Sequence, residues 1–236
     1  MEQKRERLED WAENRKKNMK DMPWKERIRW FMTYYWMQTA AVILVIVVAV
    51  YFIWFYTVGK KEVWLSGAII NVVVDQDAVD RREEAFAEAQ GLNLKKQLVT
   101  LDSSYTLDAD GEEYNQSDAA SMTKLTTYYA VGDLDLLIAP EGIFDYMESN
   151  EYSFRDLEEI LGEDFAEQFD ESSIRYMQDE NGNTYAGAIS LAGTEFLEQI
   201  AGIGEIADRE EIWIGIPYTA ERAEHAAAFM EYVLGN

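Results

Sequence analysis

Residues 40–50 read AAVILVIVVAV, an aliphatic run at the centre of a window, residues 30–59, that contains no charged side chain. A helix on the surface of a water-soluble protein would not carry such a run, so it predicts a membrane-spanning helix. Trp36 and Trp54 are 18 residues apart, which is about 27 Å along a helix and close to the hydrocarbon thickness. Aromatic residues suited to headgroup depth flank the run on both sides: Trp30, Phe31, Tyr34, Tyr35 and Trp36, then Tyr51, Trp54, Phe55 and Tyr56.

The charges on the two flanks predict the orientation. Residues 1–29 contain ten Lys or Arg against seven acids, whereas the other flank offers only Lys60 and Lys61 before acidic residues take over. Basic flanks stay inside, so we expect a single-pass cell-membrane protein with a cytoplasmic N-terminus and an extracytoplasmic C-terminal domain. The highly charged residues 2–20 predict a solvated helix. The lipid bilayer is the expected partner of the basic tail, through anionic lipid of the inner leaflet.

A cleaved signal peptide is the alternative to a permanent anchor. Such a peptide has an apolar core of about 7 to 15 residues that ends at a small-x-small cleavage site. Here the core is longer and is followed by bulky aromatic residues, and Ser66 with Ala68 form only a weak site beyond them. The sequence therefore favours an uncleaved anchor.

The charge and the cysteine content of the chain exclude several functions and structures for the outer region. Because the tail carries a net +3 of the whole-chain −24, residues 30–236 carry about −27. A domain this acidic is repelled by nucleic acid, so no nucleic-acid partner is expected. The chain has no cysteine, which excludes a lipid-modified cysteine and a disulfide framework. The outer domain must therefore be stable through its hydrophobic core alone.

The pattern beyond the anchor predicts an α/β domain. We divide the chain into a tail (1–29), a transmembrane helix (30–59), a linker (60–67) and an outer domain (68–236). Short apolar runs alternate with helical ones, which is typical of a parallel sheet covered by helices. The predicted strands are 68–74, 98–101 and 134–139, and the helices between them are 75–90 and 119–131.

The chain after Pro140 continues the α/β pattern. Asn181-Gly182 between two β-rich runs is a strong hairpin signal, because both residues accept positive φ. The hairpin strands are predicted at 174–178 and 184–190, a further strand at 212–216, and helices at 142–148, 153–161, 163–169, 194–200 and 219–234.

Catalytic and metal-binding patterns are weak. The single histidine, His225, lies among surface-type residues of the last helix, and no nucleophile-elbow motif accompanies it. The acidic turns at 108–111 and 179–182 are similar to a calcium loop, but Ser117 and Ala188 stand where its closing Glu belongs. We therefore expect no enzyme activity, no cofactor and no metal, and an extracytoplasmic hydrolase is the disfavoured alternative.

Three segments carry a resemblance to a known family. Residues 122–139, MTKLTTYYAVGDLDLLIA, resemble a helix, Gly-Asp turn and strand of bacterial extracellular solute-binding proteins of the two-lobed, type 2 periplasmic-binding class. Residues 154–161, FRDLEEIL, look like the helix that follows in that family. Residues 217–234, PYTAERAEHAAAFMEYVL, look like its closing helix. The resemblance implies a periplasmic-binding-like α/β domain, with the chain crossing near residue 139 into a second lobe.

The resemblance also has a second part and a limit. Residues 23–36, PWKERIRWFMTYYW, are similar to the aromatic juxtamembrane run of single-pass bacterial membrane proteins of unknown function. Full solute-binding proteins are usually much longer and are commonly anchored through a lipidated cysteine, and this chain has neither feature. The family likeness therefore implies a reduced solute-binding domain with a shallow cleft.

Ligand positions follow from the predicted sheet, because ligands of open α/β sheets lie beyond the carboxyl ends of the strands. The candidates are Asp75, Gln76, Ser103, Ser104, Tyr105 and Glu141, each of which also suits a helix cap or a turn. In a working cleft, Tyr105 would stack on a ring of the ligand, while Ser103 and Ser104 would donate hydrogen bonds.

Two functions remain open from the sequence. The first is a membrane-anchored recognition domain that binds a small solute without catalysis. The alternative is a structural or assembly subunit of a cell-envelope complex, which uses the fold as a scaffold to bind another envelope protein.

Overall fold

A computed structural model describes residues 23–57, 60–108, 116–162, 165, 168–179, 181–201 and 211–235. The chain divides into two compact units, residues 1–60 and residues 61–236. The helix predicted in residues 2–20 and the turn at 108–111, apart from Asp108, lie outside the described residues, as does most of the helix predicted at 163–169.

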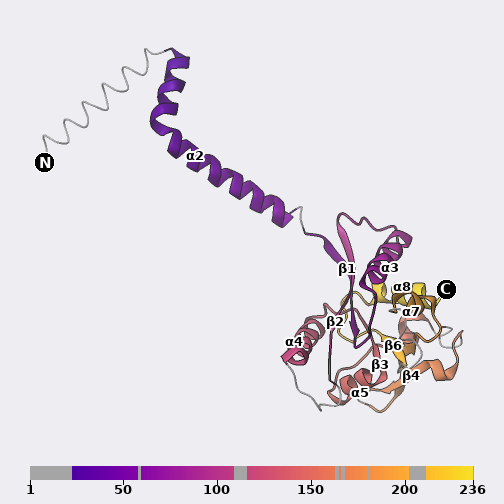
Figure 1. The fold of residues 1–236 in the computed structure, drawn as a ribbon. Coiled ribbons are helices and arrows are strands. Elements are labelled where there is room, and N and C mark those ends of the chain that lie inside the picture. Colours follow the sequence, from indigo (N-terminus) through magenta and orange to yellow (C-terminus); the bar gives the residue numbers. More distant parts are fainter. Residues whose placement is uncertain are drawn as a thin grey trace. The chain divides into compact units, whose positions relative to one another are not determined.

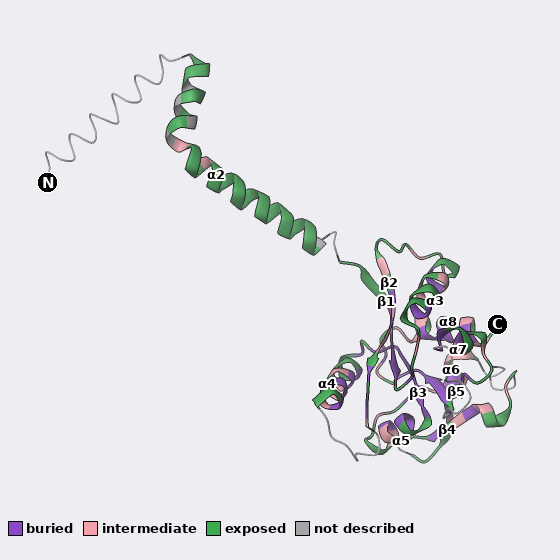
Figure 2. Ribbon diagram, viewed as in Figure 1, coloured by how far each residue is buried: buried purple, intermediate pink, exposed green. Residues whose placement is uncertain are grey.

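The first unit contains one long helix, α2 (Trp24–Thr57). Its Tyr35–Tyr56 section is 22 residues long and is the one helical section, within the described residues, that is long and apolar enough to cross a membrane. None of that section is buried inside the protein, and α2 is exposed along almost all of its described length (Figure 2). A soluble core helix would be covered by other elements, so this exposure fits a helix whose apolar surface meets lipid.

The second unit is built on one mixed sheet of six strands in the order β2-β1-β3-β6-β5-β4. β1 is parallel to β2 and β3, which confirms the predicted parallel start, whereas β6 runs antiparallel to β3 and β5, and β4 antiparallel to β5. The strands after Pro140 therefore extend the first sheet. Their bounds are β1 Glu62–Ile70, β2 Gln97–Tyr105, β3 Leu136–Pro140, β4 Ile174–Gln178, β5 Thr184–Ser190 and β6 Ile212–Gly215.

Helices cover both faces of this sheet. Apolar side chains of α3 (Gln76–Ala89), α6 (Leu157–Leu161), α7 (Glu195–Ile200) and α8 (Ala223–Leu234) join one buried cluster. Those of α4 (Gln116–Val131) and α5 (Glu141–Ser149) join the other. In Figure 1, α3 and α4 accordingly lie on opposite sides of β1 and β2. A short 3-10 turn, Glu171–Ser173, precedes β4.

Two cap positions agree with the sequence. Asp75 caps α3 by accepting a hydrogen bond from Asp77 N at 3.0 Å. Gly132 follows α4 with φ of +76°, and a Cβ there would lie 2.7 Å from Thr219 O. Glycine is therefore required both for the left-handed backbone and for the close approach of the segment before α8.

The first two strands are longer than predicted. β1 begins at Glu62, so residues 62–67, which were assigned to a linker, belong to the sheet, and the strand ends at Ile70 because Asn71 adopts φ of +54°. β2 continues to Tyr105 instead of ending at Leu101. Leu65 and Tyr105 are buried, but most of the other added residues are polar or only partly buried, so these parts of the chain lack the continuous apolar run that signals a buried strand.

The hairpin strands β4 and β5 match their predicted bounds, but the turn between them differs. Of Asn181 and Gly182, only Gly182 has positive φ (+82°), and the Asp179 carboxylate accepts hydrogen bonds from the N–H groups of Asn181 and Asn183 at 2.8 Å each. The acidic residue at this turn thus caps the loop, as a short side chain with two acceptor oxygens commonly does.

Candidate functional site

A groove of about 560 Å³ follows β2, the strand at one end of the sheet. It is lined from both sides of the strand, by α3 on one face of the sheet and by Tyr128 of α4 on the other. Its volume lies in the range of small-molecule pockets. Four of the six predicted ligand positions line it: Gln76, Ser103, Ser104 and Tyr105.

On the α3 side, two successive hydrogen bonds lead from a hydroxyl donor through an amide to the Asp80 carboxylate. Ser103 Oγ donates to Gln76 Oε1 at 2.7 Å, and Gln76 Nε2 donates to Asp80 Oδ1 at 2.8 Å. One turn further along, Glu83 Oε1 accepts from Leu101 N at 2.6 Å. These bonds use the Ser103 hydroxyl hydrogen and one of the two Gln76 Nε2 hydrogens, and they leave the second carboxylate oxygens of Asp80 and Glu83 able to accept. This side of the groove therefore suits a ligand that donates hydrogen bonds.

The same side is electrostatically negative. Among the described residues, no Lys or Arg nitrogen lies within 4.0 Å of the Asp80 or Glu83 carboxylate. Burial raises the pKa of Glu83 to about 7, and the charges of Asp80 and Glu84 add to the rise, although the bond from Leu101 N opposes it. A bound cation would relieve this repulsion and favour the ionised carboxylate.

The α4 side holds a compensated ion pair. Lys124 Nζ donates to Asp102 Oδ2, and Ser104 N donates to Asp102 Oδ1 at 2.9 Å. Burial acts to raise the pKa of Asp102, but the bonds from Lys124 and Ser104 outweigh it and hold that pKa below its ordinary value. This carboxylate already has its cation, so it is less available to a ligand than those on the α3 side.

The Tyr105 ring, for which a stacking role was expected, is covered by the protein itself. Its side chain is 4% exposed, and the Lys124 ammonium lies 4.5 Å from the centre of its ring, where a ligand ring would have to stack. Tyr128, on the next helix along, also lines the groove and is 40% exposed. It is the aromatic side chain that a ligand at this site would meet.

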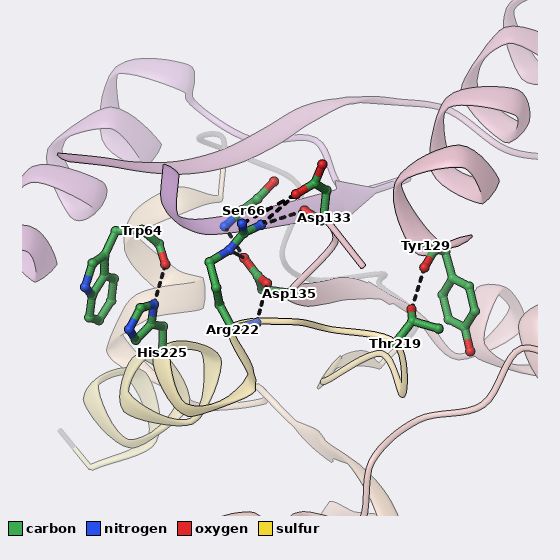
Figure 3. Close-up of polar contacts among 8 residues, drawn as sticks. All are labelled: Trp64, Ser66, Tyr129, Asp133, Asp135, Thr219, Arg222 and His225. Carbon is green, nitrogen blue, oxygen red and sulfur yellow. Dashed lines mark hydrogen bonds and ion pairs between the residues drawn. The ribbon is translucent and has the colours of Figure 1, made fainter. Parts of the chain in front are cut away.

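A buried ion pair between Asp135 and Arg222 lies beside the groove, which Arg222 also lines (Figure 3). Asp135, which is fully buried, accepts hydrogen bonds from Ser66 N and Arg222 Nε at 2.8 Å each, and from Arg222 N at 3.3 Å. Arg222 also reaches the carbonyl and carboxylate oxygens of Asp133 at 3.2 and 3.4 Å. Burial raises the pKa of Asp135, and the Arg222 and Ser66 donors oppose the rise. Arg222 is thereby held by protein carboxylates.

Two predicted positions lie outside the groove. Asp75 serves as the cap of α3 and lies 4.0 Å from Arg81, and Glu141 opens α5 and pairs with Arg175 at 3.4 Å. The sheet separates them, because α3 and α5 pack on opposite faces. Residues following β1 and β3 therefore do not converge on one site.

The single histidine is not a free surface residue. The His225 ring stacks on Trp64 with ring centres 3.9 Å apart, and its Nδ1 donates to Trp64 O at 2.7 Å (Figure 3). It is partly buried and is not among the residues that line the groove. Its contacts tie α8 to the start of β1.

Sequence reasoning missed the acceptors Asp80 and Glu83 as well as Tyr128. Gln76, Asp80 and Glu83 are spaced i, i+4 and i+7, so a helix places all three on one face. That spacing was available from the sequence. The position of this face against the edge of β2 was not.

Comparison of the chain with protein-family models, with curated protein sequences and with solved structures finds no match in any of the three.

We expect Asp135→Asn to destabilise the outer domain by about 2–4 kcal/mol, because Arg222 would lose its buried counter-charge. Chemical denaturation of residues 60–236, which contain both buried clusters, would measure the change. Asp133→Asn is the matched control: that side chain is 52% exposed, so the expected change is below about 1 kcal/mol. Equal effects of the two variants would contradict the structural role of Asp135.

We expect Glu83 to make the domain less stable as the pH rises. An unfolded chain releases this proton near pH 4.5, but the folded one keeps it until about pH 7, so stability contributed at low pH is lost between these values. The loss is on the order of 1–3 kcal/mol. In Glu83→Gln this part of the pH dependence should vanish, while Glu88→Gln, at an exposed position that does not contribute to the shift, should retain it in denaturation series at pH 5 and 8. An unchanged profile in Glu83→Gln would refute the assignment.

Proposed function

We propose that this chain is a membrane-anchored extracytoplasmic recognition protein that binds a small cationic ligand in the groove along β2, without catalysis. The observation that carries the proposal is the groove itself, which presents free acceptor oxygens of Asp80 and Glu83 beside hydroxyls and one exposed aromatic ring. A pocket of this size with a few placed polar groups is typical of small-molecule sites.

The chemistry of the groove supports a ligand that carries an amine or guanidinium group. The Ser103 hydroxyl hydrogen and one of the two Gln76 Nε2 hydrogens are already used within the protein, while Asp80 and Glu83 each keep an acceptor oxygen on the α3 side. The net charge of about −27 on residues 30–236 adds long-range attraction for a cation. Tyr128 offers a ring face for the apolar or cationic part of the same ligand.

The proposed cellular arrangement follows from the long helix and its flanks. The Tyr35–Tyr56 section would cross the membrane once, and the excess of Lys and Arg in residues 1–29 favours a cytoplasmic N-terminus. The resemblance of residues 122–139 and 217–234 to solute-binding proteins supports recognition as the role of the outer domain, in reduced form. A non-catalytic role is supported by the position of His225, which contacts Trp64 outside the groove.

The decisive test is calorimetric titration of the full chain in lipid nanodiscs with amines, guanidinium compounds, basic peptides, neutral sugars and neutral amino acids. We expect binding by cationic members of the set, and we expect it to strengthen from pH 6 to pH 8 as Glu83 ionises. Asp80→Asn should weaken the binding about tenfold, the size expected for one charge-assisted hydrogen bond.

Asp77→Asn is the matched control for that titration, because it removes the same charge from the exposed first turn of the same helix, outside the groove. Equal weakening in both variants would mean that only general charge attraction is at work. If the wild-type chain gave no binding heat with any class of compound, the proposed ligand role would be refuted.

The second candidate is an assembly subunit, and the exposed side of α4 favours it. Ala120, Thr123, Thr127, Tyr128 and Val131 are exposed there and uncharged, although the surrounding domain is strongly acidic. The cores of protein contacts are depleted of charged residues, and this face of α4 shares that property.

A photo-crosslinker at Thr127 in intact membranes separates the two functions. An assembly subunit would trap one defined neighbouring protein through Thr127, whereas a free receptor would give none. As a control, the same probe at exposed Glu84, on the opposite face of the sheet, should trap nothing specific in either case. A defined product at Thr127 together with silent calorimetry would replace the ligand role by the assembly role.

A further inference from the structure

The helix α2 is longer than the section that a membrane crossing needs. Its Tyr35–Tyr56 section spans about 33 Å, which already matches the hydrocarbon core and the headgroup boundary. Residues 24–34, here called the juxtamembrane section, add about 16 Å of helix before it. The juxtamembrane section is therefore not needed to cross the hydrocarbon core.

The juxtamembrane section is amphipathic. Trp24, Ile28 and Phe31 follow each other at spacings of four and three residues, which places them on one face, and they are 68%, 53% and 49% exposed. The Phe31 ring stacks on Tyr35, the first residue of the apolar section, with ring centres 5.3 Å apart. The apolar face of the section is thus continuous with the surface expected to contact lipid.

The opposite face is polar and basic. Successive positions of a helix differ by about 100°, which places Arg29 and Thr33 on the side away from Trp24, while Lys25 lies at the border, with its ammonium 5.8 Å from the centre of the Trp24 ring. The section as a whole contains three basic residues against the single acid Glu26, and residues 1–29 together carry +3. Lys25 and Arg29 belong to the polar face or its border, whereas Arg27 falls about 40° from Phe31, at the other border of the apolar face. A helix with this distribution is typical of one that lies in a membrane interface.

A local hydrogen bond allows the section to leave the direction of the span. Thr33 Oγ1 donates to Arg29 O at 2.8 Å, a contact that competes with the helical backbone bonds and often bends helices. The ribbon of α2 changes direction in its N-terminal half (Figure 1). Such a bend lets the juxtamembrane section lie along a membrane surface while the following section crosses it.

We propose that the juxtamembrane section lies in the headgroup layer of an anionic phospholipid leaflet, with Trp24, Ile28 and Phe31 toward the acyl chains and Lys25 and Arg29 toward the phosphates. The inference rests on the proposed membrane anchoring. Lipid is the favoured occupant because the apolar face joins the lipid-facing surface directly, and because the positive charge complements anionic headgroups.

Single-cysteine spin labelling tests this, because the natural chain contains no cysteine. Labels replace Ile28, Glu26 or Leu44 in the full chain, which is reconstituted in phosphatidylcholine liposomes with or without phosphatidylglycerol. Accessibility to oxygen and to a water-soluble nickel chelate then reports depth. We expect the label of Ile28→Cys to favour oxygen and that of Glu26→Cys to favour nickel, with phosphatidylglycerol deepening the label at position 28.

Leu44→Cys separates failure of this inference from failure of the anchor, because it lies inside the apolar section. Water access at positions 26 and 28 with lipid access at position 44 would overturn the inference and leave the anchor standing. Water access at position 44 would overturn both. Exclusion of both reagents from position 28 would mean contact with protein, and would overturn lipid as the occupant.

The charge requirement is tested by Lys25→Gln with Arg29→Gln, combined with the label at position 28. Each basic residue near an anionic surface strengthens binding several-fold. The deepening of the label at position 28 that phosphatidylglycerol causes should therefore fall by roughly tenfold or more. Lys60→Gln with Lys61→Gln removes the same charge from the other flank and should leave the response intact. An undiminished response in the first pair would refute phosphate recognition by Lys25 and Arg29.

Discussion

The buried carboxylate of Asp135 joins parts of the outer domain that are distant in sequence. It accepts a backbone hydrogen bond from Ser66 in the middle of β1 and side-chain and backbone bonds from Arg222, which immediately precedes α8. A fully buried charge is costly unless it is paired and hydrogen-bonded, so the position of each partner is tightly constrained. This one interaction therefore fixes the register between the sheet and its last helix, and with it one end of the groove.

The order of the strands determines which side chains can act together. The chain goes from β1 to β2 at one edge and then returns to β3 on the other side of β1, so that α3 and α4 cover opposite faces. Gln76 and Ser103 consequently meet at β2, whereas Glu141 opens a helix on the far face and pairs with Arg175. The groove follows the edge of the sheet because the strand there has a neighbour on one side only.

Elements with a strong local signal were predicted closely, and elements whose limits depend on neighbours were not. The strands of the 174–190 hairpin matched because a glycine turn between two β-rich runs is encoded within a few residues. β1 was predicted to begin too late and β2 to end too early, since Glu62, Val63 and Asp102 pair in the sheet without being buried. Tyr105 was assigned a stacking role from its residue type, but its ring face is covered by Lys124 from a helix that begins 11 residues later.

The sequence by itself determined the apolar helix, the charge asymmetry of its flanks, the α/β class and the helical face shared by Gln76, Asp80 and Glu83, because each depends on composition or on spacing within one element. Only the tertiary structure decided that this face lies against β2, that Lys124 neutralises Asp102, and that Asp135 and Arg222 meet. Those contacts join residues 22 to 87 positions apart, and their formation depends on the packing of whole elements.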